Sequence, residues 1–539
     1  GNSQDMMGKQ GILLVKYTTA GTTDQLWSAR IGGPGISFDR PNQILTDENG
    51  NLIIGGASID PATGEDFTVL EYSSDGIMLK QTRYNSLYNY DDDLVSMVKD
   101  KSGNLYLAGT IYSRIYTCDY GIVKYSSDGI KEWDKYFNGD AKSYDFLSGM
   151  VLDDSDNVII TGYSAGTFSY DLATIKYSPS GEEMWISIYD ADGGGDDLAY
   201  AITKDKQNNI LIAGFSYYGS SNSDYNIVKY SSAGNLIWSR RYTGMGGYDD
   251  RIVDMVVDVN NNIYVTGWSG GLDTTYDIVT IKYNSYGDSL WMRRYSGISG
   301  SNQFAVSMVY NNFDKIFVTG RQTNQNSYDT DGNQLWSHLY DGSFSGDDAP
   351  ASMAINSESE IFIVGKTMGQ DKNYDFIIIK YDSTGNIKWQ TDFSTLPGCN
   401  DEAVDIAIDN NNNVIVTGIS KGNNWSIIST IKYSKLETNV IENLNNVPDF
   451  IKLEQNYPNP FNSETTIHFH LPNSNQKKWV SLSLYNITGQ RIKTILDSPL
   501  THGDYYISIN ADELASGTYI YHLKTADGYS LSKKMVILK

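Results

Sequence analysis

Short hydrophobic runs with alternating polar residues recur along residues 11–433 with a period of about fifty residues, separated by stretches rich in Asn, Asp and Gly. Each full repeat contains four such runs, and each run has the length of a β-strand. The third run ends in tyrosine, at Tyr17, Tyr72, Tyr125, Tyr177, Tyr230, Tyr283, Tyr381 and Tyr433, and lysine precedes all of these except Tyr72. A period of this size, written entirely in short strands, predicts an all-β fold in which four-stranded blades form an eight-bladed β-propeller.

Two positions of the repeat keep a residue type that indicates close packing. The second run always ends in glycine, at Gly56, Gly109, Gly162, Gly214, Gly267, Gly320, Gly365 and Gly418, which indicates close backbone approach or a bulge. The fourth run opens with tryptophan at Trp27, Trp133, Trp185, Trp238, Trp291, Trp336 and Trp389, and with Lys80 in the remaining blade. A flat aromatic ring here can wedge between neighbouring blades, so we interpret the tryptophans as structural rather than as a ligand platform.

The order of the runs predicts how the ring closes. The N-terminal run at Trp27 is of the fourth type, so it completes the blade begun by residues 401–433 and removes a free sheet edge. The segment 12–17 then duplicates the third run of that blade. In blade six, 16 residues lead from Gly320 to Trp336, whereas 24 lead from Gly267 to Trp291 in blade five. We therefore expect blade six to lack its third strand.

The repeats stop after Tyr433, which predicts a change of domain. Residues 1–435 form the propeller, the polar stretch 436–451 is a linker, and residues 452–539 contain six or seven short alternating runs. So many strands in under a hundred residues predict a small immunoglobulin-like β-sandwich.

The formal charge of the chain is −24, and the acidic surplus lies on the repeats. An acidic surface repels phosphate backbones, so we expect no nucleic-acid partner. Two cysteines, Cys118 and Cys399, cannot build a disulfide framework, and no apolar run has the roughly 20 residues of a membrane helix. Because the chain starts at Gly1 without methionine, we expect that an export signal has been removed.

Aspartates at the start of the first run form the candidate metal site. They are Asp92, Asp145, Asp197, Asp250, Asp348 and Asp401, and a second column (Asp66, Asp119, Asp171, Asp224, Asp277 and Asp375) precedes the third runs on the same face. Clustered carboxylates suit Ca²⁺, so calcium is a possible ligand, and we expect no other cofactor. The alternative interpretation is architectural, since a carboxylate at a strand start commonly accepts backbone N–H bonds and fixes a turn.

The sequence gives little support for catalysis. Of five histidines only His338 lies in the repeats, and no Cys-x-x-Cys, phosphate loop or nucleophile elbow occurs. We therefore predict that the chain is not an enzyme. The alternative is a carboxylate-based hydrolase or lyase acting on polysaccharide, for which Asp254 and Asp405 near the ring axis are the best candidates.

The repeats resemble the SBBP-type repeat of bacterial propellers, whose core appears here as Asp100-Lys-Ser-Gly-Asn-Leu-Tyr-Leu-Ala-Gly109. Their glycine-then-tryptophan turn is also similar to the tryptophan docking motif of quinoprotein dehydrogenases. That family places adjacent cysteines near its cofactor, whereas Cys118 and Cys399 are far apart in sequence, so the resemblance is to a fold and not to a quinone activity.

The C-terminal region resembles the type A C-terminal sorting domain of the type IX secretion system. The matching pieces include Asn456-Tyr457-Pro458-Asn459-Pro460-Phe461-Asn462, Gly489 after Leu484-Tyr-Asn-Ile-Thr, Gly517 within Leu514-Ala-Ser-Gly-Thr-Tyr519, and Lys533-Lys534 before the C-terminus. The resemblance implies that the type IX secretion machinery is a partner and that the protein is secreted or attached to the outer cell surface.

These observations predict a secreted or cell-surface, non-catalytic propeller that acts as a binding or structural platform, with a cell-surface glycan or protein as possible partner. The alternative is self-association: a strand donated from one molecule to the vacancy in another would build an extracellular filament or surface layer.

Overall fold

The computed structural model consists of two compact units, Gly1–Leu436 and Glu437–Lys539, which we describe separately. The structure describes residues 25–31, 39–60, 62–114, 117–191, 194–217, 222–245, 247–271, 275–297, 301–311, 313–321, 324–340, 342, 348–369, 372–394, 399–422, 425–433, 452–453, 456, 459, 461–471, 477–486, 490–501, 503–511, 514–525 and 530–538. The expected linker and the strand-like segment 12–17 lie outside these residues.

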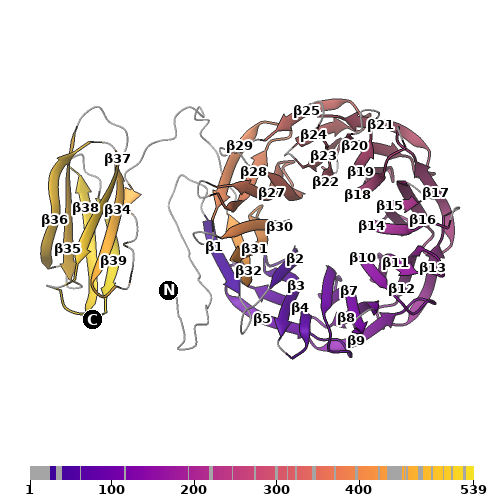
Figure 1. Ribbon diagram of the computed structural model, residues 1–539, viewed down its shortest axis with the longest axis horizontal. Coiled ribbons are helices and arrows are strands. Elements are labelled where there is room, and N and C mark those ends of the chain that lie inside the picture. The colour runs from indigo at the N-terminus through magenta and orange to yellow at the C-terminus, as the bar shows by residue number, and fades with distance from the viewer. Residues whose placement is uncertain are drawn as a thin grey trace. The chain divides into compact units, whose positions relative to one another are not determined.

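The first unit is an eight-bladed β-propeller, in which eight four-stranded antiparallel sheets surround a common axis (Figure 1). Blade one contains β2 (Arg40–Thr46), β3 (Leu52–Asp60), β4 (Gly64–Tyr72) and β5 (Met78–Tyr84). Blade two contains β6 (Asp92–Lys99), β7 (Leu105–Arg114), β8 (Thr117–Tyr125) and β9 (Lys131–Phe137). Blade three contains β10 (Asp145–Leu152), β11 (Val158–Ala165), β12 (Tyr170–Tyr177) and β13 (Glu183–Tyr189). Blade four contains β14 (Asp197–Lys204), β15 (Ile210–Tyr217), β16 (Ser223–Tyr230) and β17 (Leu236–Tyr242).

The remaining blades follow the same order, with the first strand innermost. Blade five contains β18 (Asp250–Val257), β19 (Ile263–Gly270), β20 (Tyr276–Tyr283) and β21 (Ser289–Tyr295). Blade six contains β22 (Ala305–Tyr310), β23 (Lys315–Gly320), β24 (Asn324–Asp329) and β25 (Gln334–Leu339). Blade seven contains β26 (Ala349–Ile355), β27 (Ile361–Met368), β28 (Tyr374–Tyr381) and β29 (Ile387–Phe393). Blade eight contains β30 (Asn400–Ile408), β31 (Val414–Gly422), β32 (Trp425–Tyr433) and the N-terminal strand β1 (Gln25–Ile31).

Blade eight closes the ring with both ends of the repeat region. Strand β1 pairs antiparallel with β32, from Gln25 opposite Tyr433 to Ile31 opposite Ile428, and Figure 1 shows the indigo strand beside the orange ones. The junction with blade one is also bonded, because the Lys432 ammonium donates to the Ser74 carbonyl at 3.2 Å.

Blade six has four strands, so the prediction that it lacks its third strand was wrong. Strand β24 pairs with both β23 and β25. All four strands are shortened to six residues, and three residues connect β23 to β24, so the sixteen-residue spacing still holds a third strand. Since the blade is complete, it offers no vacancy for a strand donated by another molecule.

The glycine that ends the second strand makes the close backbone approach expected from the sequence. The first strand of each blade carries a bulge opposite this glycine, as between Leu147 and Gly149 opposite Gly162. A Cβ atom at Gly214 would lie 1.9 Å from the Leu198 carbonyl oxygen, a distance that no side chain can occupy.

Tryptophans dock blades two to five onto the blades that follow them. The indole N–H groups of Trp133, Trp185, Trp238 and Trp291 donate to the carbonyls of Pro179, Ser232, Ser285 and Thr330 in the following blades. The ring lies on a glycine of that same turn: a Cβ at Gly234 would come within 2.6 Å of the Trp185 ring. In blade one the Lys80 side chain occupies the corresponding place against Gly129.

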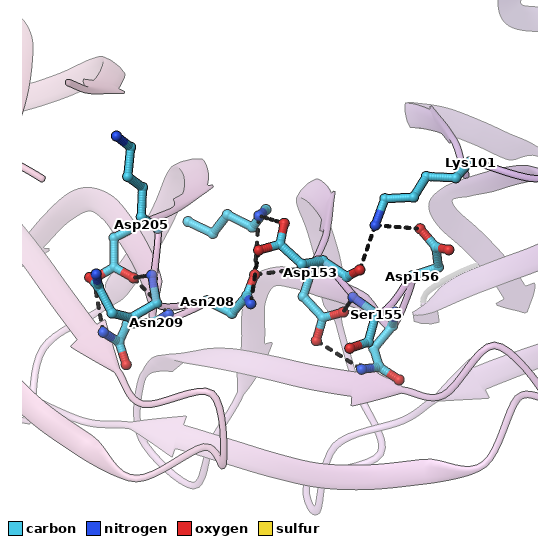
Figure 2. Close-up of polar contacts among 12 residues, drawn as sticks. Lys101, Asp153, Ser155, Asp156, Asp205, Asn208 and Asn209 are labelled. Atoms are coloured by element: carbon cyan, nitrogen blue, oxygen red, sulfur yellow. Dashed lines mark hydrogen bonds and ion pairs between the residues drawn. The ribbon is translucent and has the colours of Figure 1, made fainter. Parts of the chain in front are cut away.

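Acidic residues at the end of the first strands hold the hairpin turns (Figure 2). The Asp153 carboxylate accepts the N–H groups of Ser155 and Asn157 at 2.8 and 3.0 Å and pairs with the buried Lys176 ammonium at 2.8 Å. Neighbouring turns are joined as well, since Asn208 Oδ1 accepts the Asp154 N–H at 3.0 Å. This face of the propeller, which we call the hairpin face, is therefore tied together by its own polar side chains.

The second unit is a small β-sandwich. One sheet contains β33 (Lys452–Leu453), β34 (Glu464–Leu471) and β37 (Gly503–Asn510), and the other contains β36 (Arg491–Leu500), β35 (Lys478–Asn486), β38 (Gly517–Thr525) and β39 (Ser530–Ile537). Its core is built from alternating inward residues such as Ile467, Phe469, Leu482 and Leu484. In the described part of the chain, no helix has the length and apolar character needed to cross a membrane.

Candidate functional site

The start face, opposite the hairpin face, is where the first and third strands begin. The aspartates that lead the first strands lie here and are almost fully buried: Asp92, Asp145, Asp197, Asp250 and Asp401 are 0% exposed and Asp348 is 8% exposed. Five of them accept the backbone N–H of the residue six positions earlier, from Ser86, Gly139, Ala191, Gly244 and Gly342 at 2.5–2.8 Å. The carboxylate thus ties the loop arriving from the preceding blade, which is the architectural role.

The second acidic column is neutralised in several blades by arginine from the fourth strand. Arg83 pairs with Asp66 at 2.7 Å and Arg294 pairs with Asp277 at 2.8 Å, while Arg241 Nε donates to Asp224 at 2.5 Å. These carboxylates are therefore already bound to cations of the protein.

Blade three differs, because Ile188 stands at the arginine position and an extra carboxylate is present. Carboxylate oxygens of Asp171, Asp190 and Asp197 all lie within 4.8 Å of one another. Burial, together with these neighbours, raises the pKa of Asp197 to about 6. Of the six leading aspartates, Asp197 is thus the one that the described structure places in a group of three, and calcium binding there stays a prediction.

Asp254 and Asp405 each join two blades. The Asp254 carboxylate accepts the Met308 N–H of blade six at 2.7 Å, and Asp405 accepts the Ile44 N–H of blade one at 3.0 Å. Burial raises the pKa of Asp254 to about 6. The two residues therefore serve different blade junctions.

Asp92 makes the stability of the propeller depend on pH. Burial, partly offset by the hydrogen bond from Ser86, raises the pKa of Asp92 to about 7, against roughly 3.9 in an unfolded chain. Because the folded state binds this proton more tightly, the contribution to stability is full below pH ~4, falls as the pH rises to ~7, and stays low above it. We expect Asp92→Asn, which keeps an oxygen for the Ser86 N–H, to raise the melting temperature at about pH 8 by roughly 2 °C or more.

Thermal denaturation between about pH 5 and pH 8 measures this effect, with the exposed Asp128→Asn as control. The Asp92→Asn profile should be flatter than those of the natural chain and the control. An equal slope for all three proteins would show that Asp92 does not contribute.

Sequence reasoning missed a row of aromatic side chains on the start face. They occupy the positions directly after the leading aspartate and directly after the second-strand glycine, which are cross-strand partners, as Phe146 and Tyr163 are. In blades three to six these positions carry mostly rings, with centroids 5.2 Å apart for Phe146 and Tyr163 and 5.4 Å for Trp268 and Phe304. The signal that could have found them is the change to aromatic residues in two columns that hold charged, small or aliphatic residues in the other blades.

The remaining part of the same rim carries ion pairs. Arg40 contacts Asp93 across the junction of blades one and two at 2.9 Å, and Lys366 contacts Glu402 across the junction of blades seven and eight at 3.2 Å. The two parts of the start face therefore have different chemistry. Charged side chains pair with one another at the junctions of blades one and two and of blades seven and eight, whereas blades three to six present aromatic rings.

In the C-terminal unit, the predicted export residues connect the start of the domain to its last strand. Asn459 donates to the Lys534 carbonyl at 3.1 Å and accepts the Val536 N–H at 2.7 Å, and Phe461 pairs with the backbone of β39. Asn456 is buried, with its amide on Thr465 at 2.9 Å, whereas Asn462 is exposed. Gly517 begins β38, and Lys533 and Lys534 lie on β39. Tyr457, Pro458, Pro460 and Gly489 lie outside the described residues.

Comparison with known proteins finds matches to this chain. Residues 455–538 match the family described as the secretion system C-terminal sorting domain. The chain is 24% identical over 315 residues to an uncharacterized WD repeat-containing protein, L264, of Acanthamoeba polyphaga mimivirus, covering 56% of this chain and 21% of the relative. A search of solved structures finds Raptor of Chaetomium thermophilum, with a TM-score of 0.38 and 11% identity over 64% of this chain and 28% of Raptor.

The chain thus spans about a fifth of the curated relative that it matches and little more than a quarter of Raptor. The C-terminal domain is a type IX sorting domain that engages the type IX secretion machinery, and the propeller that it carries is secreted to the cell surface or the extracellular space.

Proposed function

We propose that this protein is a non-catalytic binding platform, a rigid propeller of the SBBP repeat type that the type IX system places outside the cell. The observation that carries the proposal is the use made of its carboxylates. Those at the ring axis accept backbone N–H groups of the next blade, and those on the start face hold loops or pair with arginine. Carboxylates used in this way serve the architecture of the ring.

A filament built by strand donation is not favoured, because blade six is complete. A polysaccharide hydrolase or lyase is not favoured either, because Asp254 and Asp405 belong to separate junctions. The binding role is supported by the row of rings on the start face, beside the group of Asp171, Asp190 and Asp197.

The absence of catalysis is testable with the full chain. Incubation with neutral and acidic polysaccharides, followed by assays for new reducing ends and for unsaturated products, should give no signal above a heat-denatured sample. Turnover that disappears in Asp254→Asn, Asp405→Asn would contradict the proposal and favour the carboxylate enzyme.

Export is testable with the C-terminal unit, which has its own core. We expect residues 437–539, fused to a periplasmic fluorescent reporter in a bacterium with a type IX system, to carry most of the reporter outside the cell. Asn459→Ala should reduce the exported fraction severalfold, because it removes both bonds to β39, each worth about 1 kcal/mol. Thr494→Ala, at an exposed position of β36 outside the matching motif pieces, is the control, and a reporter retained in the periplasm in all cases would refute the role.

A further inference from the structure

The row of rings on the start face spans blades three to six. Phe146 contacts Tyr163 in blade three, Tyr200 of blade four contacts Phe215 at 5.5 Å, and Trp268 contacts Phe304 of blade six. We call Phe146, Tyr163, Tyr200, Arg251, Trp268 and Phe304 the aromatic arc.

Arg251 joins the two halves of the arc. Its guanidinium lies between two rings, 4.5 Å from the Phe215 centroid and 5.3 Å from the Trp268 centroid. One of its NH₂ groups donates to the Tyr217 hydroxyl at 3.1 Å and contacts Asp249 at 3.5 Å, while its buried Nε–H has no hydrogen-bond partner among the described residues. The arginine is held flat by stacking, and its donors are only partly used.

The arc is accessible to a ligand. The Arg251 side chain is 30% exposed and Tyr200 is 49% exposed, whereas Phe215 is buried beneath them at 3%. Phe146, Tyr163, Trp268 and Phe304 are partly exposed. The tyrosines of this surface, Tyr163, Tyr200 and Tyr217, also carry phenol hydroxyls that can hydrogen-bond.

We propose that the aromatic arc binds a neutral, linear glycan; this rests on the proposed binding function and specifies its ligand. A sugar ring has an apolar C–H face and a rim of hydroxyls, which match aromatic faces interleaved with phenol and guanidinium groups. Apart from Tyr200, which lies at the bulge of β14, the arc follows one position on each of two paired strands, so it forms a narrow strip that suits a single extended chain. A protein partner needs a patch of about 800 Å² with an apolar centre, and the rings of the arc are mostly half-buried.

Charge decides against ionic glycans. The one cation of the arc is balanced by Asp249 at 3.5 Å, and the chain carries −24 overall, so a polyanion is repelled. The ion-paired part of the rim carries the charged residues Arg40, Asp93, Lys366 and Glu402 at positions that hold rings in the arc. Neutral sugar units are therefore the ligand that both the stacking surface and the electrostatics accept.

Isothermal titration of the full chain with neutral β-linked hexasaccharides of glucose, xylose and mannose tests the proposal, with galacturonate hexamers as the anionic arm. We expect at least one neutral hexamer to bind and the galacturonate hexamer to bind more weakly. Tyr200→Ala and Trp268→Ala should each weaken binding about tenfold. Tyr286→Ala removes an aromatic side chain that is 75% exposed on a turn of the hairpin face, so it is the matched control and should not change the affinity.

Tyr200 is half exposed, so its replacement is expected to leave the fold intact, and thermal denaturation verifies this for both variants. Failure of all neutral hexamers to bind, unchanged affinity in Tyr200→Ala, or tighter binding of the galacturonate hexamer would each overturn the assignment. A protein partner lost on Tyr200→Ala, with no hexamer bound, would overturn it too. None of these results would affect export or the absence of turnover, so the broader proposed function is tested separately.

Discussion

Replacing Trp238 by alanine is expected to lower the free energy of unfolding of the propeller by about 3–5 kcal/mol. Trp238 is 8% exposed, and its indole N–H donates to the Ser285 carbonyl of the next blade at 3.3 Å. Arg240 stacks on the indole, with its carbon 5.3 Å from the ring centroid, and donates to the Gly287 carbonyl at 2.7 Å. Truncation therefore removes a large apolar surface and leaves a cavity at the junction of blades four and five.

Urea denaturation followed by circular dichroism measures this loss, and Trp238→Phe provides the graded comparison. Phenylalanine keeps most of the stacking and loses the N–H donor, so it should cost about 1 kcal/mol. The Ser285 carbonyl keeps the Lys229 ammonium as donor at 3.2 Å in both variants. If Trp238→Ala costs under about 1 kcal/mol, the tryptophans do not dock the blades, and the structural interpretation of that column fails.

The repeat made the propeller predictable. When all eight blades have the same residue type at one position, the fold requires that residue type there. An example is Gly214, which lies close to the Leu198 carbonyl. Period and strand type together then define a four-stranded blade. The last blade lacked a fourth strand, so the Trp27 strand could be assigned to the position beside β32. The local sequence pattern was sufficient to predict the fold because every blade packs against its neighbours in the same way.

The error in blade six came from counting residues instead of landmarks. Tyr328 precedes Trp336 by eight residues, just as Tyr283 precedes Trp291, so the end of the third strand was present in the sequence. Ser327 replaces the lysine that precedes the tyrosine in most other blades, so the end of the third strand was not recognised. In the structure Tyr328 is 2% exposed and packs on Trp291, as the tyrosines of complete blades pack on the preceding tryptophan. Burial of this ring fixed the strand despite the short connection.

The candidate site was less predictable for the opposite reason. Repeated aspartates attracted attention, but a residue that recurs in every blade serves every blade, as Asp92 and Asp145 do by holding loops. A ligand site that occupies only part of the ring has to be formed by residues that differ from blade to blade. The positions of Arg251 and Trp268 hold different residue types in different blades. Only the fold shows that these two side chains lie beside each other.

Removing residues 1–31 is expected to have the other large effect, because it takes away β1 and leaves β32 as an open sheet edge. Six paired positions join β1 to β32, and at about 1 kcal/mol for each backbone hydrogen bond their loss corresponds to roughly 5 kcal/mol. The ring would then be held at blade eight only by contacts with blade one, such as Asp405 with the Ile44 N–H and Lys432 with the Ser74 carbonyl. We expect a lower melting temperature and concentration-dependent association, because an unpaired strand edge is a template for another chain.

A second truncation that ends before Gln25 keeps β1 and separates closure from any other role of the N-terminus. Calorimetry and light scattering of the two truncated proteins and the full chain measure both effects. Closure by β1 predicts that the shorter truncation has the melting temperature and the molecular mass in solution of the full chain. Only the longer truncation should be destabilised. Equal behaviour of the two truncations would mean that blades one and eight hold the ring without the N-terminal strand, so that the side-chain contacts between them carry the closure.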